Sequence, residues 1–244
     1  MSADIRVAAT IFVAGVMFST QGRAWGPFGY PVITPVAATE LAPTARTQVE
    51  QLLGSPAEDV LLGTLWTKAS PELAGGELRG CMLEYAVLAR DFVYKNGTLI
   101  HIGGSIGVWT ANRNIATTLT VVLHDIDPRT AAFAPSAPKS AYFVSGGETT
   151  KDAITRIIES NSPGRFTELL NVDRTLEIIL QGISHGNITI AFARTANGRG
   201  VQFSVDSSVV ETSANGTRTK SPATADEFLK CNQALVEGLE RSAN

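Results

Sequence analysis

Large hydrophobic residues alternate with smaller or polar ones along much of the chain after residue 71, which is the pattern of strands with one buried face. The clearest case is a pair of runs, 187–194 and 201–210, in which Ile188, Ile190 and Phe192 recur at every second position. Residues 195–200 between them are small or turn-forming, so the two runs predict a β-hairpin. Further strands are expected at 98–102, 108–109, 119–123 and 141–144.

An earlier run, 83–95, is rich in β-branched and aromatic residues and ends at Asn96-Gly97, the strongest turn signal in the chain. It predicts a strand, although the LEYAVLAR portion fits a helix equally well. Gly103 to Gly107 is glycine-rich but lacks the residues of a phosphate-binding loop. A bend or bulge in a strand is the better interpretation.

Helical spacing returns in residues 149–183, which predict a helical insert. Thr149 or Thr150 can cap a first helix, whose stripe is Ile154, Ile157 and Ile158. Ser162-Pro163 is expected to begin a second, carrying Phe166, Leu169 and Leu170. The last part, around Leu176 to Ile183, fits either a helix or a strand.

The final helix has the clearest signals. Thr224-Ala-Asp-Glu227 has the form of a capping box, and the residues that follow on one face are Phe228, Cys231, Leu235 and Leu239. The sequence therefore predicts an α+β fold for residues 71–244, with a mainly antiparallel sheet, the helical insert and this C-terminal helix. A short helical segment, 25–70, is expected to precede it, joined by a linker at 71–76.

Residues 1–24 have the form of a secretory signal peptide. Arg6 lies before an apolar stretch from Val7 to Phe18, and Gly22-Arg23-Ala24 places small residues where a signal peptidase cleaves. Cleavage there would make Trp25 the N-terminus of a periplasmic or secreted protein; an uncleaved anchor is the alternative. No later segment is apolar and long enough to predict a membrane span.

The chain contains two cysteines, Cys81 and Cys231. In an exported protein an even pair indicates a disulfide, because the compartment is oxidising. Two unrelated buried thiols are the alternative.

Composition adds little about chemistry. The net charge of −3 provides no basic field that would attract nucleic acid.

The densest polar cluster is His124-Asp125-x-Asp127, which could hold a metal ion or place a carboxylate beside a histidine base. On a strand, however, His124 and Asp125 face opposite sides, so a turn before Pro128 is preferred. His101 and His185 are expected to be structural or surface residues.

The region from Trp25 to Lys68 resembles the start of the S1/P1 nuclease family of exported zinc enzymes. The resemblance rests on Trp25-Gly26-x-x-Gly29 and on an apolar helix pattern from Leu41 to Gly54. It implies that Trp25 binds zinc through its free amine and carbonyl. At the sixth mature position, where the family has a histidine ligand, this chain has Tyr30, and Trp66-Thr67-Lys68 is the nearest counterpart of a carboxylate-bearing motif. The ligand positions are thus altered, and Tyr30 and Lys68 are poor zinc ligands.

Three histidines, His101, His124 and His185, are too few for the multi-zinc site that the resemblance implies. The sequence therefore predicts an exported, non-catalytic periplasmic protein with a binding or envelope role, and no catalytic, cofactor or metal residues. The alternative is an S1/P1-type zinc nuclease with a degenerate ligand set, Trp25 and Tyr30. A hydrolase with a scattered catalytic triad is a third hypothesis. The body of the chain resembles small exported bacterial domains with two cysteines, a likeness that bears on the fold alone.

Overall fold

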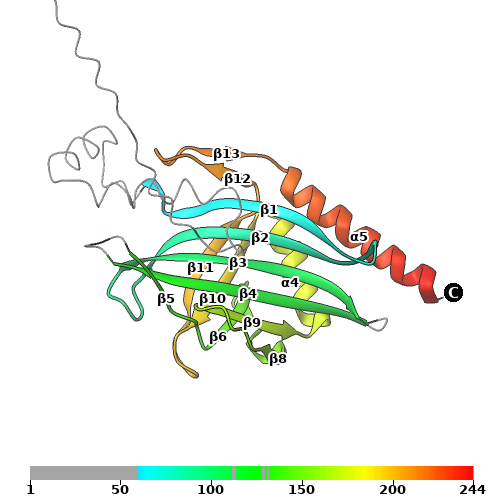
Figure 1. The fold of residues 1–244 in the computed structure, drawn as a ribbon, viewed down its shortest axis with the longest axis horizontal. Helices are drawn as coiled ribbons and strands as arrows, with labels where there is room; N and C mark the ends of the chain where they lie inside the picture. Colours follow the sequence, from blue (N-terminus) through cyan, green and yellow to red (C-terminus); the bar gives the residue numbers. More distant parts are fainter. Residues whose placement is uncertain (1–59, 112–113, 128–129, 131, 244) are drawn as a thin grey trace, which may run out of the picture.

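The computed structural model describes residues 60–111, 114–127, 130 and 132–243. The largest unit is one seven-stranded antiparallel sheet (Figure 1). Its order is β1-β2-β3-β4-β9-β8, and the short β5 pairs with the end of β4. The strands are β1 (Gly63–Ala74), β2 (Glu77–Asp91), β3 (Thr98–Ala111), β4 (Asn114–Ile126), β5 (Phe133–Pro135), β8 (Ile154–Ile158) and β9 (Arg165–Leu170).

A second, four-stranded sheet has the order β11-β10-β6-β7, and a small β12–β13 hairpin stands beside β1. The helices α4 and α5 pack against the strands, α4 on β10, β6 and β4, and α5 on β2 and β1. The remaining elements are β6 (Ser140–Ser145), β7 (Glu148–Thr149), the 3-10 turn η1 (Lys151–Ala153), α4 (Val172–Ser184), β10 (Asn187–Ala193), β11 (Val201–Asp206), β12 (Val209–Thr212), β13 (Arg218–Lys220) and α5 (Ala223–Ala243). The predicted α+β fold with a mainly antiparallel sheet is confirmed.

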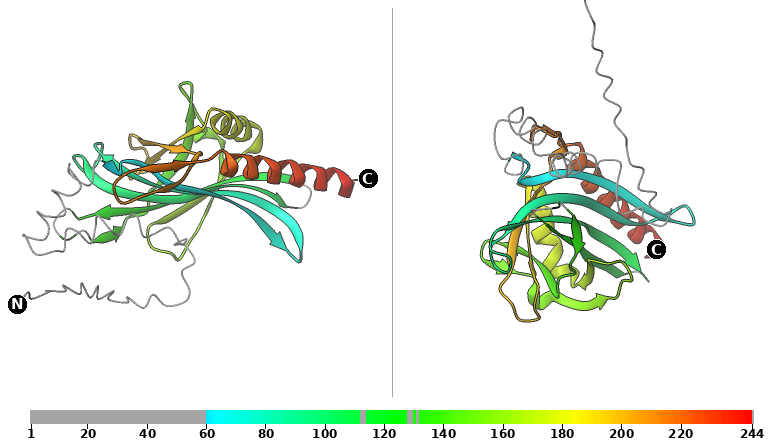
Figure 2. Two further views of the ribbon diagram at one scale, coloured as in Figure 1. Left: turned by 90° about the horizontal axis from the view of Figure 1, so that it is seen from above. Right: turned by 60° about the vertical axis from the view of Figure 1, so that its left-hand side comes forward.

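The main core lies between the two sheets. Figure 2 shows the long strands curving across one side, with the second sheet and both helices on the other. Alternation puts every second residue of the long strands into this core, as the pleat requires. Those of β2, β3 and β4 include Leu83, Tyr85, Val87, Ile100, Ile102, Leu119, Val121 and Leu123.

The glycine-rich stretch of β3 is a regular strand and not the predicted bend or bulge. Its register with β2 and β4 is continuous. Glycine is required because neighbouring rings cross the strand: a Cβ at Gly104 would lie 2.6 Å from the Tyr85 hydroxyl oxygen, and one at Gly107 would lie 2.3 Å from Trp109 Nε1. Tyr85 reaches over Gly104 to donate a 3.0 Å hydrogen bond to the Thr120 carbonyl.

The start of the described chain corrects the predicted domain boundary. Residues 63–70, expected to end a helical segment, lie in β1, and so does most of the expected linker. Gly75 and Gly76, both at positive φ, form the turn into β2. Thr67, on β1, donates a 2.9 Å hydrogen bond to the Val209 carbonyl. This part of the chain therefore belongs to the α+β domain. Residues 25–59 of the expected helical segment lie outside the described residues.

The helical insert is confirmed only in its last part. Residues 172–184 form α4, but 154–158 and 165–170, both expected as helices, are β8 and β9. Each run is too short to be a stable helix by itself, and β-branched residues favour extended structure. The expected cap Thr150 instead accepts a hydrogen bond from the Phe143 N–H through its hydroxyl.

The hairpin between 187 and 210 and the C-terminal helix are confirmed, with small changes. The second hairpin strand is divided into β11 and β12. The helix α5 begins at Ala223, one residue before the expected cap Thr224. Thr224 is buried within the helix, and the Ala223 N–H donates instead to Ser221 Oγ.

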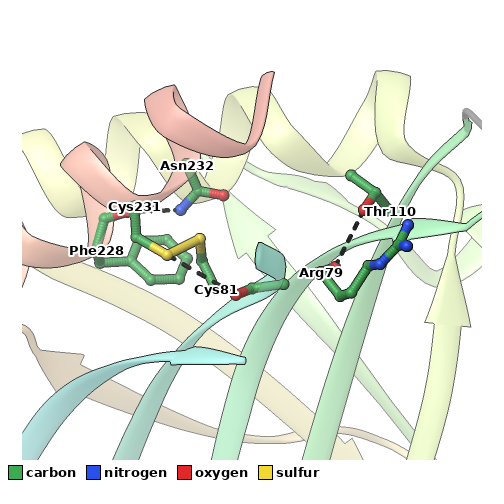
Figure 3. The surroundings of a disulfide bond; sticks show 7 residues. Arg79, Cys81, Thr110, Phe228, Cys231 and Asn232 are labelled. Carbon is green, nitrogen blue, oxygen red and sulfur yellow. Dashed lines mark hydrogen bonds between the residues drawn. A yellow bond between two sulfur atoms is a disulfide. The ribbon is translucent and has the colours of Figure 1, made fainter. Parts of the chain in front are cut away.

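Cys81 on β2 and Cys231 on α5 form the predicted disulfide (Figure 3). Phe228, one turn before Cys231, is fully buried, and Asn232 Nδ2 donates a 2.7 Å hydrogen bond to the Phe228 carbonyl. The bond thus joins the C-terminal helix to the large sheet across 150 residues of chain.

Candidate functional site

The densest group of charged side chains lies at one end of the two sheets and is centred on Arg194, just after β10. Its guanidinium donates to three side chains: Asp91 at 2.7 Å, Asp125 at 2.6 Å and Ser136 at 2.7 Å. These partners come from β2, β4 and the loop after β5. Arg194 therefore ties the end of the second sheet to the end of the large sheet.

Asp91 is the most deeply buried member of this group. Its side chain is 0% exposed, and Oδ2 accepts the bond from Arg194. Oδ1 accepts bonds from the N–H groups of Val93 and Tyr94 at 3.1 and 2.8 Å. The carboxylate thus satisfies two backbone donors of the β2–β3 loop and the charge of Arg194 at once.

Asp125 completes the group near the surface. Besides Arg194, it pairs with Lys95 Nζ at 3.2 Å. Two carboxylates therefore face two cations, and the charges balance within the group. A balanced, hydrogen-bonded arrangement of this kind holds elements together, and it leaves no charge in excess that would activate a nucleophile.

The predicted split of His124-Asp125-x-Asp127 is confirmed, but its preferred location in a turn is wrong for the first two residues. His124 and Asp125 lie within β4, on opposite faces. Only Asp127 follows the strand, where its N–H donates to the Ala132 carbonyl at 3.0 Å. Asp125, which is next to His124 in the sequence, therefore forms an ion pair with Arg194 on the other face of the strand.

His124 lies directly across from His101 of β3, a pairing that the sequence did not suggest. The ring centroids are 6.1 Å apart, and Phe133 of β5 packs edge-on against both rings. Burial, together with the neighbouring His124, lowers the pKa of His101 to about 3. Burial also lowers the pKa of His124, although Asp125 opposes the shift. Both imidazoles are thus neutral at pH 7, packed beside a small apolar cluster that includes Leu88, Leu99 and Ile126.

Glu168, on β9, is a buried titratable residue that the sequence alone did not indicate. It is 0% exposed and faces the main core between Leu119 and Ile157 of the neighbouring strands. Burial raises its pKa to about 8, and the Ala141 backbone N–H offsets this only in part. The sequence signal for its burial is the alternation of Phe166, Glu168 and Leu170, which places Glu168 on an apolar strand face.

An open, largely apolar pocket of about 580 Å³ lies against α4. It is lined by Val172, Leu176 and Leu180 of the helix, by Ile115 of β4, and by polar residues such as Glu177 and His185. The Nδ1 atom of His185 lies 2.7 Å from the Gln181 carbonyl, which fits the expected structural role at the end of the helix.

Trp25 and Tyr30, the zinc ligands of the nuclease hypothesis, lie outside the described residues. The third counterpart, Trp66-Thr67-Lys68, lies on β1 and not on a helix. Among the described residues, no three His, Cys, Asp or Glu side chains are grouped so that they could hold a metal ion. In the same part of the chain, neither helix is long and apolar enough to cross a membrane.

Comparison of the chain with models of known protein families, with characterised proteins and with solved structures gives no significant match.

Proposed function

We propose that this protein is exported to the periplasm and acts there by binding a partner, without catalysing a reaction. The signal-like N-terminus and the disulfide between Cys81 and Cys231 support export to an oxidising compartment. The disulfide links two elements of the core, so its formation belongs to the folding of the whole domain.

The Arg194 group is the observation that carries the binding role. Catalytic residues are usually charged or titratable side chains that line a cleft and still have hydrogen-bonding atoms available to a substrate. Here Arg194 and Lys95 neutralise Asp91 and Asp125 across two sheets. His101 and His124 are neutral and pack on Phe133. These polar residues of the described chain thus stabilise the fold. We therefore assign recognition of the partner to the exposed surface.

The test is expression of the full chain in a Gram-negative host, followed by fractionation and a nuclease assay. We expect a periplasmic protein whose first residue is Trp25 and which does not cleave single-stranded nucleic acid with or without added zinc. A matched variant, Tyr30→Phe, which removes the phenol oxygen, checks any activity found: loss of zinc-dependent cleavage in it would establish the S1/P1-type hypothesis and overturn the proposal. Recovery of the unprocessed chain in the cytoplasm would also overturn it.

A further inference from the structure

The loop between β2 and β3 presents the most exposed large apolar side chain of the described residues. Phe92 is 74% exposed, and its neighbour Val93 is 38% exposed. The other exposed large apolar side chains lie on other elements, β1, β8 and α5. We call residues 91–97, together with the contacting 194–200 loop, the hairpin tip.

The hairpin tip is held in one conformation by its own hydrogen bonds. The Asp91 carbonyl accepts from the N–H groups of Lys95 and Gly97 at 3.2 and 2.8 Å, while its carboxylate holds Val93 and Tyr94. The Tyr94 hydroxyl donates at 2.6 Å to the Arg199 carbonyl, which fastens the second loop to the first. Asn96 and Gly97 take the positive φ angles that close the turn. Phe92 is therefore presented to solvent by a preorganised loop, which lowers the entropy cost of binding.

The tip is also positively charged, although the whole chain carries −3. Its one acid, Asp91, pairs with Arg194, and its Lys95 pairs with Asp125 of β4. The exposed Arg199, on the second loop, adds a further positive charge to the tip. An apolar protrusion on a tip that also carries exposed cations complements an interface that is apolar below and anionic above.

We propose that the hairpin tip binds a lipid surface carrying anionic headgroups, with Phe92 and Val93 entering the interface and Lys95 and Arg199 facing the headgroups. The proposal rests on the proposed function, since only an exported binding protein meets such a surface in the envelope. A specific protein interface needs a broad complementary area of about 1,000 Å² or more. Two adjacent side chains on a protruding loop provide much less than that, whereas a few apolar and cationic residues suffice for peripheral lipid binding.

Co-sedimentation of the purified mature protein with vesicles tests this proposal. One vesicle set contains about a third phosphatidylglycerol in phosphatidylcholine, and the other contains phosphatidylcholine alone. We expect binding to the anionic set that weakens as salt is added. Phe92→Ser should lower the partition coefficient at least about tenfold, the cost of losing one buried aromatic side chain, and Arg199→Gln about fivefold. Val236→Ser, an exposed apolar residue on α5, is the matched control and should bind like the wild type.

Three results would overturn the proposal: no binding to anionic vesicles, equal binding to both vesicle sets, or unchanged binding by Phe92→Ser. A photo-crosslinking residue at position 92 that joins to a periplasmic protein and not to lipid would also do so. These outcomes are separable from failure of the proposed function, which is judged by processing at Trp25 and by the nuclease assay. A protein that is exported, has no nuclease activity and does not bind vesicles would contradict only the proposed lipid binding.

Discussion

Glu168 is an acid on a strand face that otherwise packs into the core, and its environment determines its protonation. Among the described residues, neither of its buried carboxylate oxygens has a hydrogen-bond partner of good geometry. An uncompensated charge there would be costly, so the group stays protonated well above its ordinary value of 4.5, up to a pKa of about 8. The protein thus contains a neutral acid in its core at pH 7.

Stability should therefore fall as the pH rises toward 8. Because the folded pKa is raised, the stabilisation is complete below 4.5 and is lost as the pH rises from 4.5 to about 8. His101 acts in the opposite direction only below its ordinary value of 6.5, so the range from 6.5 to 8 reports on Glu168. We expect the free energy of unfolding to fall there by up to about 2 kcal/mol.

Urea unfolding at several pH values measures this loss. Glu168→Gln should remove the fall between pH 6.5 and 8, while Glu159→Gln, at an exposed position, should retain it. An unchanged slope in Glu168→Gln would show that the carboxyl group is not the one that titrates.

At Arg194, a single side chain neutralises a fully buried carboxylate, so its loss should be severe. Arg194→Met should lower the free energy of unfolding by about 3–5 kcal/mol, because Asp91 would remain buried and unpaired. Arg199→Gln, an exposed control in the same loop, should change it by less than about 0.5 kcal/mol.

A double-mutant cycle with Asp91→Asn separates this pairing from simple loss of packing. The amide oxygen that this substitution introduces can still accept from the Val93 and Tyr94 N–H groups. The second change should therefore restore part of the stability, with a coupling of about 1 kcal/mol or more. Additive losses would contradict a direct role of the ion pair.

At the scale of elements, a disulfide joins β2 to α5. This covalent bond adds to the packing of α5 against the large sheet. Phe228 and Leu235 anchor α5 in the core on either side of Cys231. Closing a loop of 150 residues constrains the unfolded chain strongly.

Reduction should therefore cost about 4–5 kcal/mol in the free energy of unfolding, with α5 still helical by circular dichroism. The double variant Cys81→Ser/Cys231→Ser should match the reduced wild type and show no response to reductant. Equal stability of oxidised and reduced protein in urea would disprove the contribution of this bond.

Elements with strong local signals could be predicted, and those fixed by tertiary contacts could not. The hairpin around residues 195–200 and helix α5 have turn and periodicity signals of their own. The strands β8 and β9 resembled helices, because a few isoleucines or leucines fit either period until a neighbouring strand pairs with them.

The Arg194 group shows the same limit at the candidate site. Arg194 lies 103 residues from Asp91 and 69 from Asp125, so no local pattern connects them. The two cysteines could be paired because the chain contains no others. The histidine pair depends on the register of β3 and β4, which the sequence did not reveal.

At the scale of the whole molecule, two sheets enclose the core, and the Arg194 ion pairs and the disulfide join elements around it. The features left for function lie on the surface, above all at the hairpin tip. The role proposed for the molecule is therefore binding by an exported protein, and zinc catalysis is the hypothesis to be tested against it.

Native mass spectrometry of the protein isolated from the periplasm tests this conclusion most directly, because one spectrum reports processing, oxidation and bound metal. The account predicts a single species beginning at Trp25, two hydrogens lighter than the reduced chain and free of zinc. A species that retains about three zinc ions per chain would contradict it.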